Sequence, residues 1–190
     1  MTRSTPTSKT GAKAKPPKSR LRRRSRRIIA GTVAAVAVTA VGWFAYRAAA
    51  DLPGAVVPSL GNEHVASLTI WHPPYNSDPP TSGPHVGYIA PWGTHTVPIP
   101  KELQVHNLED GGVAVQYNCP QGCVELVAKL KAVVDRYDRH VLLAPYPGMN
   151  TTIALTAWGR IDKFDAFDRD RIVGFIRAYA GIDHHPRGFQ

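Results

Sequence analysis

Four side chains in the second half of the chain could together bind a soft metal ion: His64, His85, His106 and Met149. Each histidine begins or ends a motif near an expected strand edge or turn. Met149 stands in PYPGMN, a turn composition, rather than in a helical stripe where methionine fills gaps in a core. Imidazole together with thioether suits copper, above all Cu(I), better than magnesium or calcium. We therefore expect a transition-metal site with copper as the first candidate. The competing interpretation is that each histidine is only a hydrogen-bonded structural residue and that Met149 packs beneath a loop.

The segment that ends at His85, DPPTSGPH, contains too much proline for a helix or a central strand. Its prolines fix the backbone before any ligand binds, and Gly83 permits a turn with positive φ. We expect an ordered loop that delivers His85 to the same pocket as His106, with Met149 on its rim.

Acidic residues close to these histidines are expected to support the site. Glu102 and Glu109 could each accept a ring N–H and orient a histidine. Asp110 is expected beside the pocket, as a weak oxygen ligand or as the acceptor of a ring N–H, and it would bias the site away from Cu(I). A hydrolase triad built on Ser82 is disfavoured because the chain lacks the G-x-S-x-G elbow around it. We expect a binding domain rather than an enzyme.

The two cysteines form a second group, NCPQGC. With Pro120 at the first helical position, Cys119 would be the N-cap residue, and the helix dipole would favour its thiolate. Cys123 would follow on the same side of the first turn. One interpretation is a structural disulfide, and the other is a redox or copper pair. Strand, C-P-x-x-C and helix in this order resemble the local arrangement of thioredoxin-like copper chaperones.

Charge is concentrated at one end of the chain. The net charge is +9, but residues 1–27 hold eleven lysines and arginines and no acid. The remaining twelve basic residues face all fourteen acids, so residues 28–190 carry a net charge of −2. Binding of nucleic acid would require basic charge on a folded face, and we therefore expect none. Residues 1–27 are expected to be a disordered cytoplasmic tail.

An uncharged stretch of nineteen residues, 28–46, follows this tail. As a helix it would be about 28 Å long, close to the thickness of a bilayer core. A basic block before a single apolar span predicts a single-pass anchor in the cytoplasmic membrane, with the N-terminus in the cytoplasm and the rest outside. The alternative is a cleaved signal peptide, because AAAD offers small residues for cleavage. Outside the cytoplasm, a disulfide between the cysteines would persist.

From the remaining sequence we predict a linker, 47–62, and one extracytoplasmic domain, 63–183. Strands are expected in HVASLTIWH, GGVAVQYN, HVLLAPYPG and TTIALTAWG, a helix from Cys119 to His140, and a closing helix in DRDRIVGFIRAYAG. The tail DHHPRGFQ is expected to fray. This order indicates one small α+β domain of mixed sheet and helices, or an α/β domain with thioredoxin-like elements.

Four motifs in this domain resemble the signature runs of the bacterial DUF3105 family: PPTSGPH, VHNLEDGGVAVQY, PYPGM and ALTAWG. The resemblance extends from about Gly61 to Ala180, and it implies no assigned activity. Members commonly carry histidine where Asp110 stands, so this chain departs from the family at that position. Beside a metal-binding domain, two functions therefore stay open: a non-catalytic structural or interaction module of the cell envelope, and a thiol–disulfide oxidoreductase using the cysteine pair. No protein partner is indicated.

Overall fold

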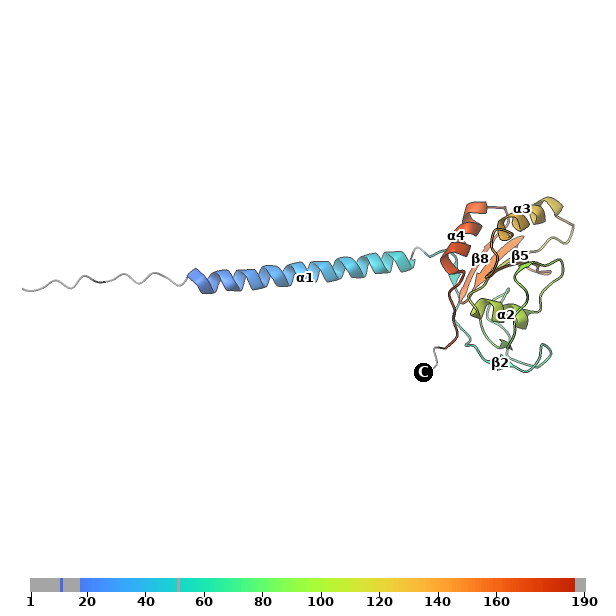
Figure 1. The fold of residues 1–190 in the computed structure, drawn as a ribbon, viewed down its shortest axis with the longest axis horizontal. Helices are drawn as coiled ribbons and strands as arrows, with labels where there is room; N and C mark the ends of the chain where they lie inside the picture. The colour runs from blue at the N-terminus through green and yellow to red at the C-terminus, as the bar shows by residue number, and fades with distance from the viewer. Residues whose placement is uncertain (1–10, 12–17, 51, 187–190) are drawn as a thin grey trace, which may run out of the picture. The chain divides into compact units, whose positions relative to one another are not determined.

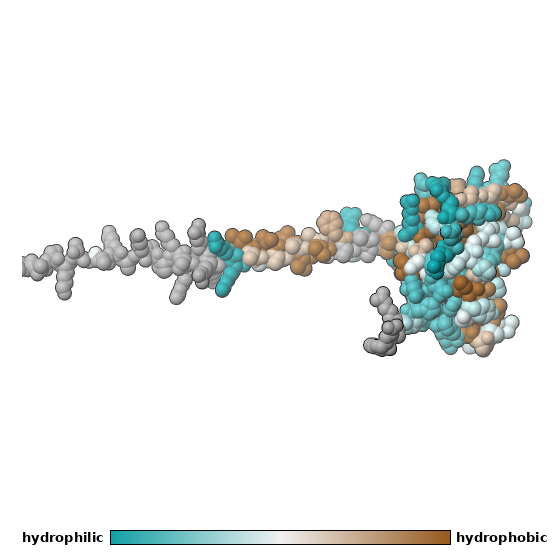
Figure 2. Space-filling model, in the orientation of Figure 1, coloured by the Kyte–Doolittle hydropathy of each residue, from teal (hydrophilic) through white to brown (hydrophobic). Residues whose placement is uncertain are grey.

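The computed structural model describes residues 11, 18–50 and 52–186, which divide into two units at Asp51. The first unit contains one helix, α1 (Lys18–Ala50). Its segment Arg26–Phe44 is long and apolar enough to cross a membrane, a property that signal sequences share. Side chains from Ile28 to Phe44 are exposed and largely apolar (Figure 2).

Helix α1 begins before the expected span. Residues 18–27, which we expected to belong to the disordered tail, are helical. Leucine and arginine are good helix formers, and elongating an existing helix costs less than starting one. The expected linker 47–62 is not a free spacer either. Its first residues end α1, and β1 (Ala55–Val56) pairs with the edge of the sheet described next.

The second unit is an α+β domain built on a six-stranded sheet in the order β1-β8-β7-β5-β6-β4. The four longest strands are β5 (Val113–Tyr117), β6 (Val141–Pro145), β7 (Ile153–Ala157) and β8 (Arg160–Phe164). Strand β5 is parallel to β6 and antiparallel to β7, and β4 (Gly93–Thr94) extends the sheet parallel to β6. The sequence predicted β5, β6 and β7 but not β8.

Helices cover both faces of this sheet (Figure 1). Helices α3 (Val124–Val134) and α4 (Arg169–Tyr179) pack on one face, against Val113, Val115 and their neighbours. Helix α2 (Lys101–Glu109) packs on the other face, where Ala114 and Leu142 contact Leu108. Because successive residues of a strand point to opposite faces, β5 and β6 contribute to both cores.

Two predicted elements are shorter in the structure than in the sequence-based prediction. Of the strand expected in residues 64–72, only β2 (His64–Val65) forms, parallel to β3 (His85–Val86). The remainder turns away, with the Ile70 N–H bonded to the Ser67 carbonyl. The helix expected from Cys119 begins five residues later, because Gly122 adopts a positive φ of 82° within the intervening turn.

Candidate metal centre

Three polar side chains project from the C-terminal end of α2. In a helix, positions i, i+3 and i+4 lie on the same side, which places His106, Glu109 and Asp110 together. Asn107, on the same helix, both accepts from the Ala90 N–H and donates to the Ala90 carbonyl, at 2.9 Å each. These two bonds fix α2 to the loop that runs beside it.

The chain turns sharply beneath the end of α2, and this turn requires glycine. The Gly112 N–H donates to the Asn107 carbonyl at 2.7 Å. A Cβ atom at Gly112 would lie only 2.4 Å from that same carbonyl oxygen. The side chains at the C-terminal end of α2 are therefore held by a turn that admits no larger residue.

The proline-rich segment 79–86 is a buried, ordered loop, as expected. The Tyr75 hydroxyl donates to the Pro84 carbonyl at 2.6 Å. Gly83 adopts a φ of 121°, and its N–H donates to the Gly61 carbonyl. The loop ends in β3, whose first residue, His85, is fully buried.

His64 and His85 are direct partners in the register of the two parallel strands β2 and β3. Their rings therefore lie side by side, with centroids 4.8 Å apart, and each is 5.1 Å from the ring of His106. Three histidines expected to form one site are thus brought together by three segments that are distant in sequence.

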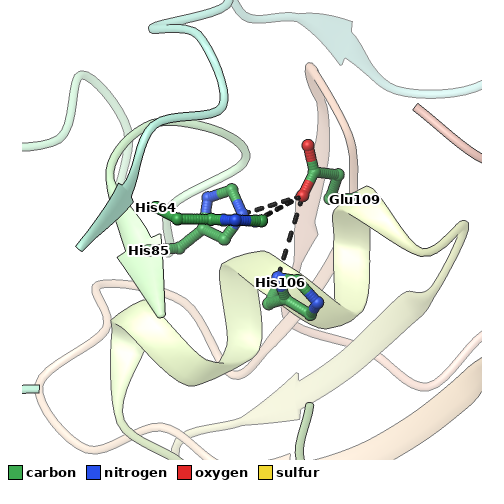
Figure 3. A group of neighbouring side chains, drawn as sticks. All are labelled: His64, His85, His106 and Glu109. Atoms are coloured by element: carbon green, nitrogen blue, oxygen red, sulfur yellow. Dashed lines mark hydrogen bonds and ion pairs between the residues drawn. The ribbon is translucent and has the colours of Figure 1, made fainter. Parts of the chain in front are cut away.

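Contacts from all three rings converge on a single carboxylate oxygen (Figure 3). Glu109 Oε2 is 2.9 Å from His85 Nε2, 3.3 Å from His64 Nε2 and 3.7 Å from His106 Nδ1. Each of the four residues offers a ligand atom within 4.8 Å of all the others. Ligand atoms placed tetrahedrally around a zinc-sized ion, with bonds of about 2.0–2.1 Å, would be about 3.3 Å apart. The three distances to Glu109 are close to that value.

Hydrogen bonds within the protein do not satisfy all the polar atoms of this cluster. His85 Nδ1 lies 2.7 Å from the Gly83 carbonyl, and a carbonyl only accepts, so the proton of the neutral ring is on Nδ1. The lone pair of His85 Nε2 then faces the Glu109 carboxylate, and two acceptors 2.9 Å apart require a cation between them, either a proton or a metal ion. Among the described residues, only four buried side-chain polar atoms lack a partner, and Glu109 Oε1 and His106 Nδ1 are two of them.

Electrostatics favour a carboxylate at Glu109 and a neutral ring at His106, which are the protonation states that metal binding requires. Burial by itself raises the pKa of Glu109. The hydrogen bond that a proton on His85 Nε2 would make, a hydrogen bond from Asn62 and the charge of the neighbouring histidines outweigh burial and hold this pKa below its ordinary value. Burial lowers the pKa of His106, and the nearby rings of His85 and His64 lower it further, against the opposing effects of Asp110 and Glu109.

Two of the predicted residues lie elsewhere. Met149 is buried against Tyr146 and Ala154, and its carbonyl accepts from Asn118, just beyond the C-terminal end of β5. Helix α2 ends at Glu109, which precedes the other end of that strand, so Met149 is not on the rim of this pocket.

Glu102, expected to orient a ring of the site, pairs instead with His72 at 3.3 Å. Position 102 is at the opposite end of α2 from the cluster, which explains the separation. Asp110 adjoins the cluster as expected, with Oδ1 3.8 Å from His106 Nε2.

His185 contacts the cluster and was missed, because the tail was expected to fray. Its Nε2 lies 3.3 Å from Glu109 Oε2. Residues 181–186 pack on the domain: the His184 N–H donates to the Glu109 carbonyl at 2.8 Å, and the His184 ring stacks on Trp158. The paired histidines in DHHP were the only sequence signal for this contact.

Cys119 and Cys123 form a disulfide with their Cα atoms 5.8 Å apart. Cys123, not Cys119, is the N-cap residue of α3, and both residues are half-buried. Neither belongs to the histidine cluster.

Fold and site together define an α+β domain that carries a buried cluster of histidines and one carboxylate, preceded in sequence by a long apolar helix. The family model described as "Protein of unknown function (DUF3105)" matches residues 64–189, and the chain belongs to this family. The matched region begins at His64 and includes His185, so the whole cluster lies within the family domain. No curated protein and no solved structure matches the chain.

Proposed function

We propose that the domain binds a divalent transition-metal ion through His64, His85, His106 and Glu109. The observation that carries this proposal is the acceptor pair formed by His85 Nε2 and Glu109 Oε2, 2.9 Å apart in a buried position. A metal ion would neutralise this pair and would also satisfy His106 Nδ1, which has no other partner. Compared with the set expected from sequence, Glu109 takes the place of Met149.

Copper remains the first metal to test, as Cu(II) rather than Cu(I). Three imidazoles and a carboxylate lack the thioether that favours Cu(I), and Cu(II) binds such nitrogen and oxygen donors more tightly than the other divalent first-row ions. Zinc is the main competitor, because tetrahedral sites of this composition suit it. Elemental analysis of the purified chain would identify the metal that it carries.

Metal titration of single histidine variants tests the proposal. The full chain in detergent, stripped of metal by a chelator, is titrated with Cu(II) and with Zn(II) by calorimetry. We expect His85→Ala and His106→Ala each to weaken the tightest binding at least tenfold, about 1.4 kcal/mol. The matched control is His95→Ala, because His95 Nε2 bonds only to the Pro91 carbonyl, outside the cluster. Unchanged affinity in both cluster variants would refute a metal site here.

The apolar part of α1 supports a membrane anchor that holds this domain outside the cytoplasm. A reporter fused after Gln190 is expected to be active outside the cytoplasmic membrane and to sediment with it. A soluble exported form beginning near Asp51 would instead identify the segment as a cleaved signal.

Thiol–disulfide exchange is the second candidate function, and the position of the disulfide favours it. Strand β5, α3 and β6 form a parallel unit, followed by β7, β8 and α4, with strand order β8-β7-β5-β6. Thioredoxin-like proteins carry a C-x-x-C pair between a strand and its helix, and here the pair occupies the same place with one more residue between the cysteines. The two cysteines before α3 are only half-buried, and a thiol of a partner would be able to reach them.

The double variant Cys119→Ser/Cys123→Ser separates the cysteines from the metal site. We expect it to lower the free energy of unfolding by about 2 kcal/mol, the entropy of closing so short a loop. Its affinity for Cu(II) should equal that of the unaltered chain. Loss of metal binding with an intact circular dichroism spectrum would assign the metal to the sulfur atoms instead.

A further inference from the structure

The two nitrogens of His106 face two different groups of side chains. Nδ1 points to the cluster described above, 3.7 Å from Glu109 Oε2. Nε2 points the other way, 3.8 Å from Asp110 Oδ1. The ring of His106 therefore lies between two sets of donors, and only the first has been given a role.

The C-terminal segment completes the second set. The Gly181 N–H donates to the Gly111 carbonyl at 2.8 Å, and the His184 N–H donates to the Glu109 carbonyl at the same distance. These bonds on either side of Asp110 place His185 Nδ1 3.7 Å from Asp110 Oδ1. His106, Asp110 and His185 each offer one ligand atom, and these three atoms lie within 4.8 Å of one another.

A fourth donor and a route from solvent accompany this set. Asp183 Oδ1 lies 2.7 Å from His185 Nδ1, and a cation bound there would displace the proton that this nitrogen shares with Asp183. Asp110 and Asp183 line a surface hollow of about 280 Å³, together with Trp92, Arg139 and other residues. The side chain of Asp110 is 31% exposed, whereas that of Glu109 is 1% exposed. The carboxylate of the second set therefore faces solvent, whereas that of the first set is buried.

We propose that His106 Nε2, Asp110 and His185 form a second cation site, with Asp183 beside it, joined to the first site through the ring of His106. The second site rests on the proposed function, because His106 would bind the first ion through Nδ1. When both nitrogens bind, the ring loses its remaining proton to solvent and bridges the ions as imidazolate. Two imidazoles and two carboxylates would take a divalent transition ion such as Cu(II) or Zn(II) in preference to Cu(I).

Counting the bound ions tests this proposal. The untagged full chain in detergent is dialysed against Zn(II) alone, and zinc per chain is measured by atomic spectroscopy. We expect two ions for the unaltered chain, one for Asp110→Ala and one for His64→Ala, whose half-exposed side chain belongs only to the first set. Asp138→Ala removes an exposed carboxylate outside both sets and should keep two ions. Asp110→His, which exchanges one donor for another, should also keep two.

Electron paramagnetic resonance of the copper-loaded chain gives a second readout that simple loss of stability would not produce. Two Cu(II) ions joined by imidazolate couple magnetically. The signal intensity per copper should therefore decrease when a second equivalent of copper is added to the unaltered chain, and it should not decrease in Asp110→Ala. One ion per chain, unchanged in Asp110→Ala, would overturn the second site and leave the first standing. No ion bound by any of these chains would overturn both.

Discussion

Glutamine in place of Glu109 is expected to weaken binding of the first metal ion at least a hundredfold, about 2.8 kcal/mol. Glu109 is the only anionic residue among the four proposed ligands, and its Oε2 lies within 3.7 Å of all three rings. Glutamine keeps the size of the side chain but removes the charge. A divalent ion would then be buried among neutral donors, which is costly where water cannot screen it.

The matched control for this change is Glu102→Gln. Both glutamates are on α2 and both contact histidine, but Glu102 pairs with His72 at 3.3 Å, outside the cluster. Calorimetric titration of both variants, with circular dichroism to confirm the fold, gives the comparison. Equal affinities for the two variants would contradict the central position of Glu109, and the ligand set would have to be sought elsewhere.

That the three histidines of the proposed site lie together could be predicted from sequence, because conspicuous local features mark their segments. His85 ends a run of prolines that can only be a loop, and His106 and Glu109 belong to one short motif. The role of Glu109 could not be read in the same way. It depends on α2 being a helix, since only helical spacing brings position 109 onto the same side as position 106.

Helix α2 escaped prediction for a physical reason. Periodicity reveals a helix when one face is apolar and the other is polar. Residues 104–109 are all buried, including Gln104, Asn107 and Glu109, so no polar face marks the element. A longer element with one core face was easier to predict. The buried residues of α4, namely Ile172, Phe175, Ile176 and Tyr179, recur at helical spacing within the closing helix that the sequence predicted.

His185 and β8 were missed because tertiary contacts alone define them. The segment that carries His185 is fixed by two backbone bonds, from Gly181 to Gly111 and from His184 to Glu109, which join residues at least seventy positions apart. Strand β8 has mostly half-buried residues without alternation, and it becomes a strand by pairing with β7 and β1. The amino-acid composition of each segment gives no indication of the distant residues with which it pairs.

Metal bound at this site is expected to stabilise the domain strongly. The proposed ligands come from β2, β3 and α2, which the chain brings together only when it is folded. An ion that binds the folded chain and not the unfolded one adds about 4 kcal/mol to the free energy of unfolding at a concentration one thousand times its Kd. For a domain of this size the melting temperature should rise by roughly 10 °C or more.

Thermal unfolding of the full chain in detergent, with saturating Zn(II) or with a chelator, measures this effect. The increment should disappear on addition of the chelator, and most of it should be absent in Glu109→Gln and in His64→Ala. His95→Ala should keep all of it, since that ring bonds to Pro91 and lies apart from the cluster. An increment of the same size in Glu109→Gln would mean that zinc stabilises the chain elsewhere. If the unaltered chain shows no increment, the buried cluster is held together by protons, with His85 as an imidazolium paired to Glu109.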